Sequence, residues 1–241
     1  MNKFLIIAHR GASNLAPENT LKAFKKAIDL GADCIEFDVH QSKDGEIVIM
    51  HDANTFRTTG YLGLIEDMTL EDLKKLDCGD GEAIPTLEEL IELTKGKIGL
   101  NCEIKTKGIA QKIVETFREA DLFESTIISS FNHNELLKIK KLEPHLKIAS
   151  LDPTRTGWII NWFSRKNMIK KAASNQFYGI NPLYLIVKKK FVDKAHEEKL
   201  KVFPWTVDSV TSIENLIRMG VDGIISNNIS RVQEVMNKLC D

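Results

Sequence analysis

The feature that most constrains the fold is an alternation between short apolar runs and longer amphipathic stretches, kept from one end of the chain to the other. Short apolar runs are typical of buried strands, and amphipathic stretches between them are typical of helices that connect parallel strands. Eight such runs lie at residues 4–8, 34–39, 98–104, 126–130, 147–151, 178–181, 201–207 and 223–226. Eight units of this kind predict an α/β fold, a closed (β/α)8 TIM barrel.

The stretches between the runs have helical spacing. Residues 19–30 carry Leu21, Phe24 and Ile28 on one helical face, and Gly31 follows as a stop signal. The same spacing predicts further helices at residues 110–120, 135–142, 188–200, 210–219 and 230–239.

The second and third runs are too far apart in sequence for one crossover helix. The interval contains an extra strand candidate at 46–50, a turn at 58–60, a short helix at 70–76 and a barrel helix at 86–94. No linker, low-complexity tract or repeat divides the chain. We therefore predict one catalytic domain over residues 1–241, with a small inserted subdomain after the second strand at about 44–85.

Composition excludes several classes of protein. The 33 basic and 34 acidic side chains give a net charge of -1, so we expect no nucleic-acid partner. No apolar run approaches the roughly 20 residues of a membrane-spanning helix, and the apolar start leads directly into His9 and Arg10. We expect a cytoplasmic protein without stable membrane insertion. The four cysteines form no CxxC pair and are predicted to be reduced, structural thiols. The oligomeric state is not readable from the sequence.

Acidic side chains follow two of the predicted strands. Glu36 and Asp38 are two residues apart, so their carboxylates share one face of a strand, and Glu103 on a neighbouring strand offers a third oxygen donor. Three hard oxygen ligands favour Mg²⁺ or Ca²⁺ over zinc. The alternative is that these acids only form ion pairs with Arg10 and Lys105.

Histidines also follow these strands. His9 and His51 come after different strands that the topology brings together, and histidine suits proton transfer near neutral pH, so we predict an acid–base pair. His40 is a competing candidate on the opposite face of its strand. The remaining histidines are predicted to lie at the surface, and they are His133, His145 and His196.

Arg10 and Lys105 add positive charge beside the acids. This combination is expected where an anion must bind next to a metal, and phosphate is the obvious anion. Lys105 shares a face with Glu103, and the planar guanidinium of Arg10 fits two phosphate oxygens. Charge balance alone is the alternative.

At this point the motifs are seen to resemble those of the glycerophosphodiester phosphodiesterase family over the whole chain. The matching segments, in order, are His9-Arg10-Gly11-Ala12, Ala16-Pro17-Glu18-Asn19-Thr20, Glu36-Phe37-Asp38-Val39, His51-Asp52, Arg57-Thr58-Thr59-Gly60, Ile84-Pro85-Thr86-Leu87, Asn101-Cys102-Glu103-Ile104-Lys105, Ser130-Phe131, Asn181-Pro182 and Trp205-Thr206-Val207.

The resemblance implies a barrel enzyme that uses one divalent cation, Mg²⁺ or Ca²⁺, to hydrolyse glycerophosphodiesters such as glycerophosphocholine or glycerophosphoethanolamine to glycerol 3-phosphate and an alcohol. It implies these roles: metal ligands Glu36, Asp38 and Glu103; acid–base residues His9 and His51; phosphate contacts Arg10 and Lys105; and a supporting residue, Glu18. Whether water or the glycerol 2-hydroxyl attacks first, and which histidine is the acid, stays open. The alternatives are a lysophospholipase D, a sugar-phosphate diesterase and a non-catalytic barrel that binds phosphorylated ligands.

Three further features remain open. Trp205 either stacks on the substrate glycerol or packs at the barrel rim. The apolar segment from Trp158 to Phe163, with basic residues after it, is a lid, a subunit interface, a peripheral lipid contact or a packed helix. The chain departs from the family pattern at Ser226-Asn227, where Thr-Asp is usual, and at Asp208, where Asn is common; we expect neither to touch the inferred metal or histidine set.

Overall fold

Parallel strands closed into a barrel form the centre of the molecule in the computed structural model, which describes residues 3–153 and 162–240. The strands are β1 (Leu5–His9), β2 (Cys34–Gln41), β3 (Ile47–Ile49), β4 (Gly99–Ile104), β5 (Thr126–Ser130), β6 (Lys147–Asp152), β7 (Gly179–Pro182), β8 (Lys201–Val202) and β9 (Gly223–Ser226). Neighbouring strands follow the order β8-β7-β6-β5-β4-β2-β1-β9, and β3 pairs with β2 in antiparallel fashion.

Backbone hydrogen bonds also join the two ends of this order. Asp222 N donates to Val202 O at 3.0 Å, and Ile225 N donates to Pro204 O at 3.0 Å. The predicted (β/α)8 barrel is therefore confirmed.

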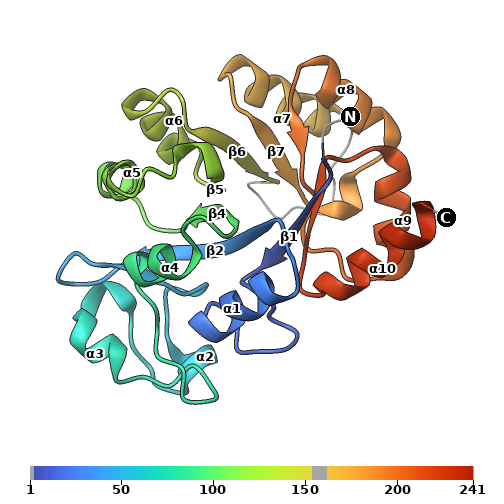
Figure 1. Cartoon of the computed structure of the whole chain (residues 1–241). Coiled ribbons are helices and arrows are strands. Elements are labelled where there is room, and N and C mark those ends of the chain that lie inside the picture. Colours follow the sequence, from blue (N-terminus) through green and yellow to red (C-terminus); the bar gives the residue numbers. More distant parts are fainter. Residues whose placement is uncertain (1–2, 154–161, 241) are drawn as a thin grey trace.

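The helices surround the strands (Figure 1). They are α1 (Leu21–Asp29), α2 (Phe56–Thr59), α3 (Leu70–Lys74), α4 (Leu87–Thr94), α5 (Ala110–Glu119), α6 (His133–Leu142), α7 (Trp162–Ser174), α8 (Lys189–Glu197), α9 (Val210–Met219) and α10 (Ile229–Cys240). No helix of residues 3–153 and 162–240 is long and apolar enough to cross a membrane.

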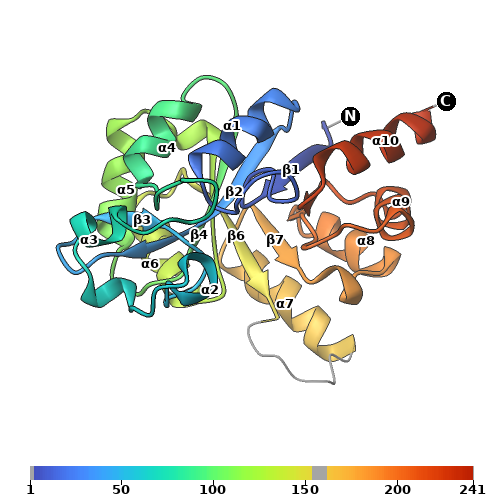
Figure 2. The ribbon, with the colours of Figure 1, turned by 90° about the horizontal axis from the view of Figure 1, so that it is seen from below.

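An extra segment lies between β2 and α4, as predicted. It comprises β3, α2, a 3₁₀ turn at Ile65–Asp67 and α3, which lie together at one side of the molecule (Figure 2). This segment has its own small apolar cluster, which is formed by Val48, Met50, Ile65, Leu73, Cys78 and Ile84.

Local signals in the sequence explain where the first helix begins. Thr20 caps α1 because its side chain accepts a hydrogen bond from Ala23 N. Gly11 precedes it with φ +79°, and a Cβ there would lie 2.7 Å from the carbonyl carbon of Ala23. Only glycine fits this close approach between the β1–α1 loop and the helix.

The inward-facing residues toward the amino ends of the barrel strands are apolar. They form one cluster, made of Ile7, Cys34, Ile127, Ala149, Phe203 and Ile225. Because side chains alternate along a strand, the next residue on the same face lies two positions further on. Two residues after these positions stand His9, Glu36, Ser129, Leu151, Trp205 and Asn227. The barrel interior is therefore apolar toward the amino ends of the strands and mostly polar toward their carboxyl ends.

Two sequence predictions need correction. The regular pairing of the seventh strand is limited to β8 instead of residues 201–207, and further on Trp205 makes an isolated bridge to Leu183. Backbone hydrogen bonds nevertheless continue beyond β8, from Phe203 N to Ile180 O at 3.0 Å and from Trp205 N to Pro182 O at 3.1 Å. His133, predicted at the surface, is buried with 7% exposure, and its Nε2 lies 3.2 Å from Leu151 O.

Other predictions are confirmed or lie outside the described residues. Cys34, Cys78 and Cys102 are free, buried thiols. The structure does not describe residues 154–161 or the side chains of residues 162–166. The predictions for the segment from Trp158 to Phe163 therefore lie outside the described residues.

Candidate active site

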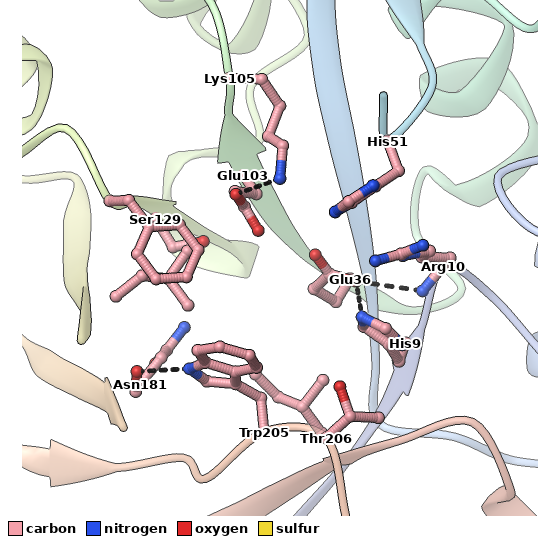
Figure 3. Close-up of a pocket in the computed structure, with 13 residues that line it drawn as sticks. His9, Arg10, Glu36, His51, Glu103, Lys105, Ser129, Asn181, Trp205 and Thr206 are labelled. Atoms are coloured by element: carbon pink, nitrogen blue, oxygen red, sulfur yellow. Dashed lines mark hydrogen bonds and ion pairs between the residues drawn. The ribbon is translucent and has the colours of Figure 1, made fainter. Parts of the chain in front are cut away.

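A pocket opens at the carboxyl ends of the barrel strands, with an empty volume of about 430 Å³ that includes its mouth (Figure 3). It is lined by His9, Arg10, Glu36, His51, Glu103, Lys105, Ser129, Phe131, Leu151, Asn181, Trp205, Thr206 and Ile225. Most of the residues singled out in the sequence thus meet in one place, where barrel proteins carry their active sites.

Three carboxylates form the deepest polar part of this site. Glu36 and Asp38 project from β2, and Glu103 from β4 lies directly beside Asp38 in the strand register. All three are buried, and one oxygen from each lies within 4.8 Å of the other two. Three oxygen donors at this spacing fit a divalent cation such as Mg²⁺ or Ca²⁺.

The electrostatics of the three acids are unequal. Burial and the charge of Asp38 raise the pKa of Glu36 well above its usual value, and they raise the pKa of Glu103 to about 7. Burial also opposes ionisation of Asp38, but the positive charges of Lys105 and Arg10 outweigh it and lower the pKa of Asp38. Like charges packed this closely hold protons unless a cation joins them.

Lys105 and Arg10 are paired with these acids. Lys105 Nζ lies 2.7 Å from Glu103 Oε1 and 3.3 Å from Asp38 Oδ1, and Arg10 Nε lies 3.5 Å from Asp38 Oδ2. Asp38 Oδ1 nevertheless makes no hydrogen bond although it is buried. The ion pairs therefore leave one acid oxygen free to accept a further partner.

The backbone of Arg10 adopts the left-handed conformation. Its φ is +56°, uncommon for a residue with a side chain, and its N–H donates to Glu36 Oε2 at 3.0 Å. Its Nη1 donates to Glu18 Oε1 at 3.0 Å. The loop after β1 thus brings Glu18 beside Arg10 and orients one of the three acids.

The two histidines reach the site from different elements. His9 ends β1, and its Nε2 lies 4.0 Å from Glu36 Oε2. His51 follows β3 in the inserted segment, and its Nδ1 lies 2.6 Å from Asp52 Oδ1. Burial lowers the pKa of both, that of His9 to about 4, so both rings are mainly neutral at pH 7.

His40 lies apart from this arrangement. Its Nε2 lies 3.2 Å from the backbone carbonyl of His51 and its Nδ1 lies 3.1 Å from Thr106 Oγ1. Both ring nitrogens are engaged in these bonds, and the ring is not part of the pocket lining.

Arg57, for which sequence reasoning gave no role, links both sides of the site. Its guanidinium donates to Glu18 Oε1 at 2.6 Å and to Asp52 Oδ2. Arg57 thereby links Glu18, which accepts a hydrogen bond from Arg10, to Asp52, which lies beside His51. The inserted segment is tied to the barrel at the pocket itself.

The wall opposite the histidines is made by β5, β7 and the segment after β8. Trp205 donates from Nε1 to Asn181 O at 2.8 Å (Figure 3). Its ring meets that of Phe131 edge to face at 5.5 Å between centroids. The side-chain polar atoms of Ser129 and Asn181 are buried without a hydrogen-bond partner. Sequence reasoning assigned these two no role, although each stands at the end of a strand.

The residues at the two departures from the family pattern also belong to the site. Asn227 Oδ1 lies 2.7 Å from His9 Nδ1, and Asn227 Nδ2 donates to Asp208 Oδ2 at 2.6 Å. The expectation that neither departure touches the histidine set is therefore wrong. Sequence spacing contained the signal, because Asn227 stands two residues after the inward-facing Ile225.

The closed parallel strands and the polar pocket at their carboxyl ends define the chain as a (β/α)8-barrel protein with a site at the top of the barrel. A family model described as the glycerophosphoryl diester phosphodiesterase family matches residues 9–231. The chain belongs to this family.

Several relatives match along nearly their full lengths. A glycerophosphodiester phosphodiesterase of Caldanaerobacter subterraneus subsp. tengcongensis is 41% identical over 98% of this chain and 99% of that protein. One of Bacillus altitudinis is 32% identical over 97% of this chain and 98% of that protein. A solved structure of an Oleispira antarctica phosphodiesterase in complex with the product sn-glycerol-3-phosphate has a TM-score of 0.83 and 29% identity, covering 97% of this chain and 96% of that one.

Proposed function

We propose that the chain is a divalent-metal-dependent glycerophosphodiester phosphodiesterase that releases glycerol 3-phosphate and an alcohol. The observation that carries the proposal is the buried cluster of three carboxylates facing two histidines in one pocket. The names of the Caldanaerobacter and Oleispira proteins and the bound product of the latter support the substrate class.

Glu36, Asp38 and Glu103 would hold the cation, Mg²⁺ or Ca²⁺. When bound, the cation would neutralise charge that builds on the phosphate during the reaction. Lys105 and Arg10, both beside the acids, would contact phosphate oxygens. Glu18 would act indirectly, because it holds the guanidinium of Arg10 at 3.0 Å.

The two histidines would divide the proton transfers. Burial lowers the pKa of His51, but the carboxylate of Asp52 beside Nδ1 opposes this effect, so of the two histidines we assign His51 as the acid that protonates the leaving alcohol. His9 bears only a neutral amide on Nδ1, so it would be the base that takes a proton on Nε2. In the step that expels the alcohol this division is the same whether water or the glycerol 2-hydroxyl attacks. If the 2-hydroxyl attacks, the two histidines would exchange roles when water opens the cyclic phosphate.

The opposite wall would receive the glycerol. Ser129 Oγ and the Asn181 amide are buried polar groups with no partner, and a buried polar group is stabilised when a ligand hydroxyl reaches it. Trp205 would cover the carbon backbone of the glycerol. We infer small soluble headgroup diesters, such as glycerophosphocholine and glycerophosphoethanolamine, as substrates.

The whole chain would form one catalytic unit. The insertion at about 44–85 supplies His51, and Arg57 fastens it to Glu18 of the barrel loop. We further propose a cytoplasmic location, since three buried cysteines are free thiols, as is usual in a reducing compartment.

The test measures glycerol 3-phosphate release from both headgroup diesters, using EDTA-stripped protein with Mg²⁺ or Ca²⁺ restored. Glu36→Gln should lose metal binding and turnover together, whereas His9→Gln should lose turnover and keep metal binding. Glu92→Gln, an exposed acid on α4, is the matched control. Release in EDTA equal to that with metal would refute metal dependence. Folded protein that releases nothing would favour a lysophospholipid substrate, tested next, and then a barrel that only binds phosphorylated ligands.

A further inference from the structure

Asp208 and Asn227, the residues at which the chain departs from the family pattern, contact one another above β9. Asn227 Nδ2 donates to Asp208 Oδ2 at 2.6 Å. The other oxygen, Asp208 Oδ1, accepts from the backbone N–H of Asn227 and from Ser226 Oγ, each at 2.9 Å. Both carboxylate oxygens are therefore occupied, and the carboxylate cannot rotate without breaking hydrogen bonds.

This arrangement dictates which way the Asn227 amide faces. A carboxylate only accepts hydrogen bonds, so the amide must turn its NH₂ toward Asp208 and its oxygen toward His9. Ser13 Oγ lies 2.9 Å from the same amide oxygen and 2.9 Å from His9 O, so its one hydroxyl hydrogen has two acceptors within reach. The carboxylate of Asp208 thus fixes one orientation of the amide.

The orientation of the amide in turn determines the state of His9. An oxygen 2.7 Å from His9 Nδ1 accepts a hydrogen bond, so Nδ1 must carry the proton of the neutral ring. Nε2 is then unprotonated, and it is the nitrogen that lies 4.0 Å from Glu36 Oε2 at the acid cluster.

We propose that Asn227, held by Asp208, is a positioning residue that keeps His9 in the tautomer with its proton on Nδ1 and its free Nε2 aimed at the reacting phosphate. The proposal rests on the proposed function for the role of His9 as the base. A neutral amide suits this place, because it orients the ring without adding a fourth carboxylate beside Glu36, Asp38 and Glu103.

Asp208→Asn is the sharpest perturbation, since it changes one oxygen to NH₂ without changing shape. The new amide keeps its oxygen where the Asn227 N–H and Ser226 Oγ donate, and so turns its NH₂ toward the Asn227 side chain. Asn227 must then flip and present its own NH₂ to His9, which moves the ring proton to Nε2. The double variant Asp208→Asn with Asn227→Asp again presents an oxygen to Nδ1.

Two readouts test the proposal. The first is the tautomer of His9, read from the ring nitrogen shifts of ¹⁵N-histidine-labelled protein in Mg²⁺ buffer at pH 7.5, with the signals assigned from their loss in His9→Gln. The second is the separation of kcat from KM with glycerophosphocholine. Asp80→Asn, which removes an exposed charge paired with Lys22, is the control.

We expect the Nδ1–H tautomer in the wild type and the control, and the Nε2–H tautomer in Asp208→Asn. In that variant kcat should fall on the order of 10²-fold, while KM stays within about twofold. The double variant should recover the Nδ1–H tautomer and most of the lost kcat.

An Nε2–H tautomer in the wild type, or an unchanged Nδ1–H tautomer in Asp208→Asn, would overturn the proposal. So would a fall in kcat that leaves the tautomer unchanged. The spectra need no substrate, so they separate this proposal from the proposed function. A tautomer that switches in a protein inactive on every glycerophosphodiester supports the positioning by Asn227 and refutes only the assigned reaction.

Discussion

Removing the charge of Glu103 should change how the stability of the metal-free protein depends on pH. Burial and the charge of Asp38 raise the pKa of Glu103 from 4.5 to about 7, and this rise corresponds to about 3 kcal/mol. The folded protein holds this proton more tightly than the unfolded chain does. The resulting stability is fully present below about pH 4.5 and is lost as pH rises to about 7.

The expected result is a difference between two proteins. Between pH 4.5 and pH 8 in EDTA, the free energy of unfolding of the wild type should fall by about 3 kcal/mol relative to Glu103→Gln, because glutamine does not titrate. His9 contributes an opposite trend, since its lowered pKa of about 4 favours the folded state as pH rises. That trend is present in both proteins and cancels in the difference.

Urea denaturation followed by tryptophan fluorescence measures this difference, with Glu92→Gln as the exposed control that should follow the wild type. Saturating Mg²⁺ or Ca²⁺ should remove the fall in the wild type, because a bound cation favours the ionised acids. Stability curves of the wild type and Glu103→Gln that run parallel across this pH range in EDTA would refute the reasoning.

The remaining predictions concern the rest of the site and one loop. His51→Gln should lower kcat by about 10²-fold or more and leave metal affinity unchanged, as measured by turnover and metal titration. Arg57→Lys should lower kcat about 10-fold with an unchanged circular dichroism spectrum, because lysine lacks the fork that joins two acids. Gly11→Ala should lower the free energy of unfolding by about 2 kcal/mol or more in urea, since alanine is strained at φ +79° and contacts α1.

The sequence predicted the barrel because every strand is an apolar run and nearly every connection has helical spacing. Its main error in the strands concerns residues 201–207, where the apolar character extends beyond the two residues of β8. Pro204 has no N–H to donate and interrupts the regular ladder, yet Trp205 N and Val207 N still donate to neighbouring strands and Val207 stays buried. Apolar periodicity reports burial, and burial continues where the regular strand geometry has ended.

The acids and histidines could be predicted because chemistry limits which residues stand at strand ends. The partners that orient them could not be predicted in the same way. Asn227 lies 218 residues from His9 in sequence, and Arg57 lies 39 residues from Glu18. His133 was misplaced for a related reason, because its burial depends on β6 and not on its own helix. Such contacts depend on how distant segments meet in the closed barrel.

The charges of the site give a common reason for the metal, the raised pKa values and the neutral amide. The connected carboxylates are Glu18, Glu36, Asp38, Asp52 and Glu103, and the cations among them are Arg10, Arg57 and Lys105. With both histidines neutral, ionisation of all the acids would leave this network two negative charges in excess, the charge that one divalent cation neutralises. Without a cation, burial and the charge of Asp38 raise the pKa of Glu103 to about 7, so that a proton relieves part of the excess. A carboxylate in place of Asn227 would enlarge the negative excess beside Glu36. The neutral amide of Asn227 orients His9 instead, and the negative charge lies on Asp208, which contacts His9 through Asn227.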